Sequence, residues 1–504
     1  MKAACKIRCK GYSNLISIRM LKYFALVSIV SALSNLAAAQ TKGVLKLHPQ
    51  NNHYFLYKEK PTILVGSGEH YGAVLNLDFN YEKYLVSLAK DGLNTTRIFT
   101  GNYVEKSGDF GIQKNTLAPQ SGSFIAPWKR SSVSGYTLGG NKFDLEKWDE
   151  AYFKRLKDFM TKAGSKGIIV EITLFSSYYG KGWENSPLNH LNNINKTDSI
   201  PAVAVNTLKN KNVIKFQEKF VRKIVRELNN FDNLYFEIQN EPWAEFSETV
   251  IRRDDYGDEK DWRSTFQVVS KTSNEWQKTV ASWIKDEERI LPNRHLISQN
   301  ISNFHYPITN PDPNVSIFNF HYALPEAVKE NYYLNKVIGF NETGFAGKTD
   351  ATYRKQAWRF LMSGGALFNH LDYSFAVEGE GGQDTVYKAP GGGSPTLRNE
   401  LGFLKRFFES KNFINFQPDN NFVPSSPGAV ALTLSNTTDT WIVYVEPVAP
   451  NSSSLTLNLP KGKYQVDWVD AASGKTSELG IITNNQVAVP AGLNDKVLFI
   501  RLKE

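Results

Sequence analysis

The sequence has very little cysteine. Its two cysteines, Cys5 and Cys9, lie near the start, so the rest of the chain has no disulfide, no thiolate metal ligand and no cysteine nucleophile. Phosphate loops, dinucleotide fingerprints and convincing metal-ligand spacings are also missing. The apolar run at 23–33 has 11 residues, whereas a membrane-spanning helix needs about 20. These absences leave a chain without the marks of redox, nucleotide or metal chemistry.

Acidic residues are absent from the first 39 positions, which carry six of the 59 lysines and arginines. The rest has 53 basic and 50 acidic residues, so most of the net charge of +9 belongs to this segment. A basic stretch, the apolar run and Ala37-Ala38-Ala39 have the order of a secretory signal peptide. Translation from Met20 and an uncleaved membrane anchor are the alternatives. We predict a secreted, periplasmic or cell-surface protein with no nucleic-acid partner and no membrane contact beyond export.

The chain after the signal segment alternates short β-rich runs with amphipathic helical runs. Val213, Phe216, Phe220, Ile224 and Leu228 recur at helical spacing. Repeated strand–helix units predict a parallel sheet, and eight of them predict a (β/α)8 TIM barrel. The strands are expected at 62–66, 94–99, 167–175, 234–239, 295–298, 315–320, 336–340 and 366–371.

The helical periodicity stops near Phe416. Short alternating strands separated by turns follow, which predicts a small all-β sandwich domain. The expected domains are a signal peptide at 1–39, a barrel at 40–415 and a β-sandwich at 416–504. The sandwich could bind carbohydrate or cover a barrel face, and the alternation of Trp441 and Trp468 within strands favours packing.

Two of the predicted strands end in a glutamate. Glu241 lies in Gln-Asn-Glu-Pro-Trp at 239–243, and Glu342 lies in Asn-Glu-Thr-Gly at 341–344. The carboxyl ends of barrel strands form the active site, so both carboxyl groups should reach the same mouth. Glycoside hydrolysis needs such a pair, one to protonate the leaving oxygen and one to attack the sugar or activate water. A loop carboxylate or a helix cap is the structural alternative for each.

Residues 234–243, Leu-Tyr-Phe-Glu-Ile-Gln-Asn-Glu-Pro-Trp, resemble the Asn-Glu-Pro signature of clan A glycoside hydrolases, the cellulase-like family 5 group in particular. The resemblance implies that Glu241 is the general acid/base and Glu342 the nucleophile. It also implies further contacts: Asn240 with the sugar 2-hydroxyl, Arg97 near the nucleophile, His321 with the sugar, and Tyr322 or Tyr306 with the nucleophile. Leu371-Asp372-Tyr373 stands where the clan often has a tryptophan.

Physical chemistry adds expectations about the acids. Strand alternation places Glu237 on the same side as Glu241 but deeper, with Arg97 as its natural partner. A retaining mechanism predicts carboxyl groups about 5–5.5 Å apart, and Glu241 should titrate above its usual range while Glu342 stays ionised. Other acids at strand ends could bind substrate, and they are Glu69, Glu171 and Asp372.

Aromatic residues after the strands could form sugar platforms or simply pack: Tyr178, Tyr179, Trp183, Trp243 and Tyr373. The sequence predicts a retaining β-glycoside hydrolase that cleaves a polysaccharide or oligosaccharide, without a cofactor or metal, as a monomer. A non-catalytic glycan-binding protein on a barrel scaffold and a polysaccharide lyase are the alternatives. The sugar, its linkage and the choice between endo and exo action stay open.

Overall fold

The computed structural model describes residues 43–245, 247–253, 261–449 and 454–503. The predicted signal peptide therefore lies outside the described residues. A parallel sheet with the strand order β4-β15-β14-β13-β12-β9-β8-β5 curls into a nearly closed barrel, which confirms the predicted fold class. Its strands are β4 (Leu64–Gly68), β5 (Thr95–Phe99), β8 (Ile169–Ser176), β9 (Leu234–Asn240), β12 (Ile297–Asn303), β13 (Ile317–His321), β14 (Val337–Glu342) and β15 (Leu367–Leu371).

The barrel closes between its first two strands through Asn94. The Asn94 backbone N–H donates to the carbonyl of Val65 at 3.1 Å, and its side-chain oxygen accepts from the Val65 N–H at 2.9 Å. Gly66 allows this close approach, since a Cβ there would lie 2.8 Å from the carbonyl oxygen of Thr95. A side chain therefore completes a seam that lacks the regular ladder of the other strand pairs.

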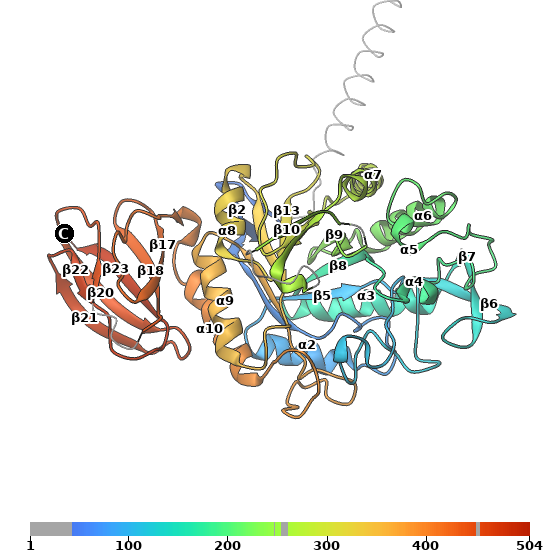
Figure 1. Ribbon diagram of the computed structural model, residues 1–504, viewed down its shortest axis with the longest axis horizontal. Coiled ribbons are helices and arrows are strands. Elements are labelled where there is room, and N and C mark those ends of the chain that lie inside the picture. Colours follow the sequence, from blue (N-terminus) through green and yellow to red (C-terminus); the bar gives the residue numbers. More distant parts are fainter. Residues whose placement is uncertain (1–42, 246, 254–260, 450–453, 504) are drawn as a thin grey trace, which may run out of the picture. The chain divides into compact units, whose positions relative to one another are not determined.

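Helices surround the barrel strands (Figure 1). Their apolar faces pack on the sheet because buried residues recur at helical spacing, as in α6 with Phe216, Phe220 and Ile224. Side-chain caps fix the starts of α3, at Asp149, and of α7, at Ser270. The helices are α2 (Tyr81–Lys90), α3 (Glu150–Ser165), α4 (Gly182–Asn185), α5 (Ala202–Val205), α6 (Val213–Leu228), α7 (Lys271–Glu288), α8 (Pro325–Asn331), α9 (Asp350–Met362) and α10 (Pro395–Glu409), with 3-10 turns η1 (Asp109–Gly111), η2 (Trp262–Ser264), η3 (Tyr332–Leu334) and η4 (Phe413–Asn415).

Three small β elements decorate the barrel. An antiparallel sheet precedes it, and two hairpins lie in the long connections after β5 and β9; β11 also pairs with β12 at its edge. Their strands are β1 (Lys46–His48), β2 (Asn51–Tyr57), β3 (Lys60–Thr62), β6 (Trp128–Ser134), β7 (Asn141–Trp148), β10 (Ser247–Arg252) and β11 (Thr265–Val269). The connections that carry the hairpins follow the carboxyl ends of barrel strands, where sequence periodicity gave no strand.

The C-terminal domain consists of a six-stranded sheet, β16-β17-β18-β23-β20-β21, and a two-stranded sheet, β19-β22. Trp441 and Trp468 are 2% and 5% exposed in the apolar core of this domain, as packing predicts. Its strands are β16 (Gln417–Pro418), β17 (Ala429–Ser435), β18 (Thr440–Pro447), β19 (Ser454–Thr456), β20 (Lys463–Asp470), β21 (Thr476–Ile482), β22 (Gln486–Ala488) and β23 (Lys496–Lys503).

Helix α9 of the barrel packs against the C-terminal domain. The Trp358 ring stacks on Tyr444 with centroids 5.6 Å apart, and its Nε1 donates to the carbonyl of Ala471 at 3.2 Å. The Arg354 guanidinium donates to Asp495 at 3.2 Å, and Arg359 donates to Glu446 at 2.6 Å. The domain boundaries stay predictions. Among the described residues, no helix combines the length and apolar character needed to cross a bilayer.

Candidate active site

Glu241 stands directly after β9 in a strained backbone conformation. Its φ is +45°, in the left-handed region that non-glycine residues rarely adopt, and Pro242 disfavours this conformation further. The backbone N–H of Glu241 donates to Asn300 Oδ1 at 3.0 Å. One carboxylate oxygen accepts from the Tyr179 hydroxyl, and the other lies 2.7 Å from His321 Nδ1. The structure thus holds this carboxyl group at the barrel mouth from three neighbouring strand ends.

Glu342 is the last residue of β14, and its donors are different. Oε2 accepts from Arg97 Nη1 at 2.8 Å and from the Tyr71 hydroxyl at 3.0 Å, while the Tyr322 hydroxyl lies 3.4 Å from Oε1. Tyr322 also has a left-handed φ of +50°, and its backbone N–H donates to the carbonyl of Glu342. A guanidinium and phenol hydroxyls therefore stabilise an ionised carboxylate at this position.

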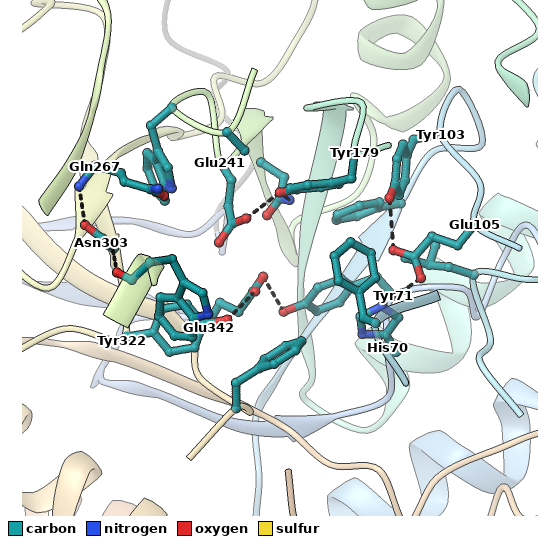
Figure 2. A pocket seen from close by; sticks show the side chains of 18 residues that line it. His70, Tyr71, Tyr103, Glu105, Tyr179, Glu241, Gln267, Asn303, Tyr322 and Glu342 are labelled. Carbon is teal, nitrogen blue, oxygen red and sulfur yellow. Dashed lines mark hydrogen bonds and ion pairs between the residues drawn. The ribbon is translucent and has the colours of Figure 1, made fainter. Parts of the chain in front are cut away.

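The two carboxyl groups face each other across the barrel mouth (Figure 2). One ligand atom each from Glu241, His321 and Glu342 lies within 4.8 Å of the others. These three groups could ligate a metal ion, but Glu241 and His321 already bond each other, and Glu342 already accepts from Arg97 and Tyr71. The absence of a metal cofactor stays a prediction.

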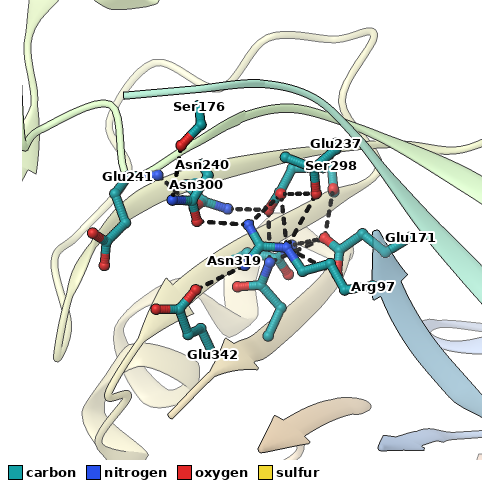
Figure 3. A network of polar contacts seen from close by, with 12 residues as sticks. Arg97, Glu171, Ser176, Glu237, Asn240, Glu241, Ser298, Asn300, Asn319 and Glu342 are labelled. Carbon is teal, nitrogen blue, oxygen red and sulfur yellow. Dashed lines mark hydrogen bonds and ion pairs between the residues drawn. The ribbon is translucent and has the colours of Figure 1, made fainter. Parts of the chain in front are cut away.

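Arg97 connects the nucleophile candidate to a polar network inside the barrel (Figure 3). Its guanidinium donates to Glu237 Oε2 through Nε at 3.0 Å and to Asn240 Oδ1 through Nη2 at 2.8 Å. This contact confirms the predicted partnership of Arg97 and Glu237. Strict alternation predicts that Asn240 faces away from Glu237, yet both bind the same guanidinium. The end of β9 therefore departs from a regular pleat just before the left-handed residue Glu241.

The pKa values of the buried acids follow from this arrangement. Burial raises the pKa of Glu241, but the hydrogen bond and charge of His321, with the Tyr179 hydroxyl, outweigh it, so the pKa lies below its usual value. The expectation that Glu241 titrates high in the free site is therefore wrong. Burial and the charge of Glu237 raise the pKa of Glu171 well above its usual value. Burial also raises the pKa of Glu237, but the charge and hydrogen bonds of Arg97 lower it by more, so the pKa lies below its usual value.

A cavity of about 270 Å³ opens above the two glutamates. Tyr179, Trp243 and Tyr322 line it, as does Asn240. The His321 ring does not line it but packs edge-on against Trp243 with centroids 5.3 Å apart. The cavity combines aromatic walls with a few polar groups, which is the usual composition of a small-molecule site.

Several predicted binding residues lie elsewhere. Tyr306 is absent from the cavity wall, and its carbonyl binds Asn331 Nδ2 at 2.9 Å, so Tyr322 is the tyrosine beside the nucleophile candidate. Trp183 is 6% exposed, and its Nε1 donates to the carbonyl of Ile200 at 2.9 Å. The prediction that Trp183 contacts substrate is therefore wrong for this conformation, because the indole packs into the loop after β8.

The other acids at strand ends do not line the cavity either. Glu69 accepts from the backbone N–H groups of Gly72 and Ala73. Glu171 lies inside the barrel, and Asp372 accepts from Arg398 at 2.6 Å. Each holds the fold together through contacts that leave it away from the cavity wall, so the expectation of a substrate-binding acid among them is not met.

Sequence reasoning missed much of the cavity wall. The missed residues include Tyr71, Tyr103, Glu105 and Phe110 on one side, and Trp262, Gln267, Asn303 and Phe345 on the other. Tyr71 follows the first barrel strand by three residues, so the strand-end rule could have found it. Phe345 follows β14 by three residues and Asn303 is the last residue of β12, so the same rule applies to both. The others lie in the long connections or at the edge hairpin, where no periodic pattern predicts position.

Three solved structures match most of this chain. A glycoside hydrolase family 5 protein from Bacteroides vulgatus ATCC 8482 has a TM-score of 0.59 and 14% identity over 91% of this chain and 94% of its own. A protein of the same organism described as a candidate glycoside hydrolase has a TM-score of 0.61 and 14% identity over 92% and 83%. A structure named glycoside hydrolase has a TM-score of 0.59 and 14% identity over 92% of this chain and 97% of its own.

The chain shares the fold of these three structures. No protein-family model and no curated protein sequence matches it. The likeness of the structures therefore establishes a TIM barrel with an added β domain, and the chemistry is argued from the side chains at the barrel mouth.

Proposed function

We propose that this protein is a retaining β-glycoside hydrolase of the family 5 type. The main support is the pair of glutamates that face each other, since one carboxylate oxygen of Glu241 lies within 4.8 Å of one of Glu342. Retaining enzymes hold their two carboxyl groups about 5–5.5 Å apart, whereas inverting enzymes need about 6.5–9.5 Å to admit a water molecule. The observed spacing favours attack by one carboxylate over activation of water between two.

Glu342 is the nucleophile in this mechanism. Arg97 and Tyr71 donate to Oε2, which leaves Oε1 on the side of Tyr322 and His321. Oε1 attacks the anomeric carbon, the glycosidic bond breaks, and the leaving oxygen takes a proton from Glu241. Water then attacks the glycosyl ester with Glu241 as the base, which restores both carboxyl groups.

Glu241 must hold a proton when the bond breaks, although its pKa is lowered in the free site. A bound sugar excludes water from the carboxyl group and competes for its contacts with Tyr179 and His321. Both effects raise the pKa of Glu241, since they remove hydrogen bonds to the charged form and increase its desolvation. We therefore infer that substrate binding itself converts Glu241 into the acid.

Variants of the two glutamates test this mechanism. Glu241→Ala and Glu342→Ala should each abolish hydrolysis of β-linked oligosaccharides, and proton NMR of the first product should show the β-anomer. Glu330→Gln is a matched control, because His305 Nδ1 lies 3.0 Å from Glu330 in a second Glu–His pair outside the cavity. Unchanged hydrolysis in both alanine variants contradicts the proposal, and glycan binding without turnover by the wild type favours a non-catalytic binding protein.

We also propose export, on the basis of the segment at 1–39, and a monomeric enzyme whose C-terminal domain packs rather than binds glycan. Export is tested by N-terminal sequencing of protein recovered outside the cytoplasm, which should begin near Gln40.

A further inference from the structure

One wall of the catalytic cavity is polar and takes no part in the reaction described above. Glu105 Oε1 accepts from the Tyr103 hydroxyl at 3.1 Å, and Oε2 accepts from Asn115 and lies 3.2 Å from His70 Nε2. The side chains of His70 and Glu105 are 11% and 4% exposed, and both line the cavity. We call these four residues the Glu105 wall.

Hydrogen bonds hold the Glu105 wall in place. The backbone N–H of Glu105 donates to the carbonyl of Leu117 at 2.9 Å, which ties two segments of the loop after β5 together. A carboxylate has about four acceptor positions, and Tyr103, Asn115 and His70 use three of them. A buried carboxylate is costly unless its positions are filled. Glu105 lines the cavity, so its remaining acceptor position is available to a bound molecule.

Aromatic rings surround this polar wall. His70 stacks on Tyr71 with centroids 5.5 Å apart, and the Tyr373 ring lies 6.2 Å from His70. Tyr373 is 6% exposed, and its hydroxyl has no hydrogen-bond partner among the described residues. Phe110 is 43% exposed with a left-handed φ of +54°, so the loop presents an aromatic side chain to solvent at the cavity edge. Aromatic faces with polar groups between them suit the C–H faces and hydroxyls of a sugar.

The Glu105 wall lies to one side of the catalytic pair. Figure 2 shows Glu241 and Glu342 between Glu105 and His70 at one end and Gln267 and Asn303 at the other. A ligand that spans the cavity therefore reaches the wall with a part that is not at the reacting bond. Among the described lining residues three are glutamates and none is lysine or arginine. This charge pattern repels a carboxylate-bearing sugar and accepts an uncharged one.

We propose, building on the glycosidase function, that the Glu105 wall is a subsite for an uncharged sugar ring. Glu105 accepts a sugar hydroxyl at its remaining acceptor position, with the aromatic rings of the cavity against the C–H face of the sugar. The subsite holds the substrate and takes no part in bond breaking. Its loss should therefore raise KM far more than it lowers kcat.

The test measures hydrolysis of β-1,4-linked tetrasaccharides of glucose, mannose, xylose and mannuronate. Wild type should cleave at least one uncharged tetrasaccharide and leave the mannuronate tetrasaccharide intact. Glu105→Gln should lower kcat/KM on the cleaved substrate by about 10- to 100-fold, mainly through KM, because a hydrogen bond to a charged group is lost. Asp109→Asn, which removes a charge from the same loop outside this cavity, should match wild type.

Thermal unfolding of each variant separates lost binding from lost folding. If Glu105→Gln does not fold, Tyr103→Phe carries the test, because it keeps the ring and removes one donor to Glu105; its KM should rise about 3- to 10-fold. Unchanged KM in a folded Glu105→Gln, or cleavage of the mannuronate substrate at the rate of the mannose one, overturns the subsite. Failure of wild type on every tetrasaccharide, together with unchanged hydrolysis of β-linked oligosaccharides in the alanine variants of Glu241 and Glu342, instead overturns the glycosidase function on which the subsite rests.

Discussion

The buried network around Arg97 makes a prediction about two glutamates that differ in charge. Arg97 faces three carboxyl groups, Glu171, Glu237 and Glu342, all nearly or fully buried. Three ionised carboxylates around one guanidinium would leave two uncompensated negative charges inside the barrel. Burial and the charge of Glu237 raise the pKa of Glu171 well above its usual value, which favours the protonated form and so removes one of these charges. One excess negative charge then remains on the carboxylates of Glu237 and Glu342 beside Arg97, and the proposed mechanism uses it on Glu342.

Glu171→Gln should therefore be nearly silent. Glu171 Oε1 accepts from Asn319 Nδ2 at 3.1 Å and from Asn341 Nδ2 at 3.0 Å, and a glutamine carbonyl can accept both bonds. Its amide N–H replaces the carboxylic acid proton. We expect the free energy of unfolding to change by less than about 1 kcal/mol and kcat to stay within about threefold of wild type.

Glu237→Gln should behave in the opposite way. Glu237 Oε2 accepts from Arg97 and from Thr173 at 2.7 Å, and Oε1 accepts from Asn341 at 2.6 Å. An amide would turn N–H groups toward donors and leave Arg97 without its partner. Breaking a buried ion pair costs about 3–5 kcal/mol, and displacement of Arg97 by about 1 Å should lower kcat about 100-fold.

Urea unfolding and hydrolysis kinetics measure both variants, and infrared spectroscopy checks the proton directly. Wild type should show the band of a protonated carboxylic acid that disappears in Glu171→Gln. A loss of about 3 kcal/mol or tenfold in kcat for Glu171→Gln, with Glu237→Gln close to wild type, would refute the charge assignment.

Three further predictions follow from single contacts. Tyr71→Phe removes the 3.0 Å hydrogen bond to Glu342, so kcat/KM measured on the cleaved tetrasaccharide should fall about 10- to 100-fold. The melting temperature should stay near that of wild type, and an unchanged kcat/KM contradicts this role. Burial raises the pKa of Glu69 from 4.5 to about 7, despite the hydrogen bonds that its carboxyl group accepts. The contribution of Glu69 to the stability of the fold is therefore fully present below pH 4.5 and is lost as the pH rises through 7. In urea titrations the stability advantage of wild type over Glu69→Gln should therefore shrink by about 3 kcal/mol from pH 4 to pH 8, and a constant difference would count against the raised pKa. Trp358→Ala removes a fully buried indole stacked on Tyr444 and should cost about 3–5 kcal/mol of unfolding free energy, whereas an effect below about 1 kcal/mol would show that α9 contributes little to domain packing.

The periodic parts of the sequence predicted the barrel well, because burial determines both the spacing of the apolar residues and the position of the strands and helices. All eight predicted barrel strands overlap observed ones. The rule that strand ends carry the site pointed to Glu241 and Glu342, which lie together at the barrel mouth, whereas the place of Arg97 beside Glu342 came from the resemblance to clan A. In the C-terminal domain, β21 has no buried side chain and β22 is only three residues long, so neither shows the alternation of buried and exposed residues on which strand prediction rests.

The rest of the site could not be predicted because loops set it. Glu105 reaches the cavity only through the fold of the connection after β5, and Gln267 only through the edge strand β11. The choice between Tyr306 and Tyr322 depended on one backbone angle, the left-handed φ of Tyr322. The pKa of Glu241 depended on His321, whose ring position depends on the end of another strand.

The left-handed conformations of Glu241 and Tyr322 have a consequence for selection. Such conformations cost about 1–3 kcal/mol each at non-glycine residues, so glycine at either position would relax the backbone. A library of this protein sorted for heat resistance alone should therefore accumulate changes at Glu241, the proposed acid/base, and at Tyr322 beside Glu342, the proposed nucleophile. Sorting for turnover should restore Glu241 and Tyr322, so the two screens would select different residues at the same two positions.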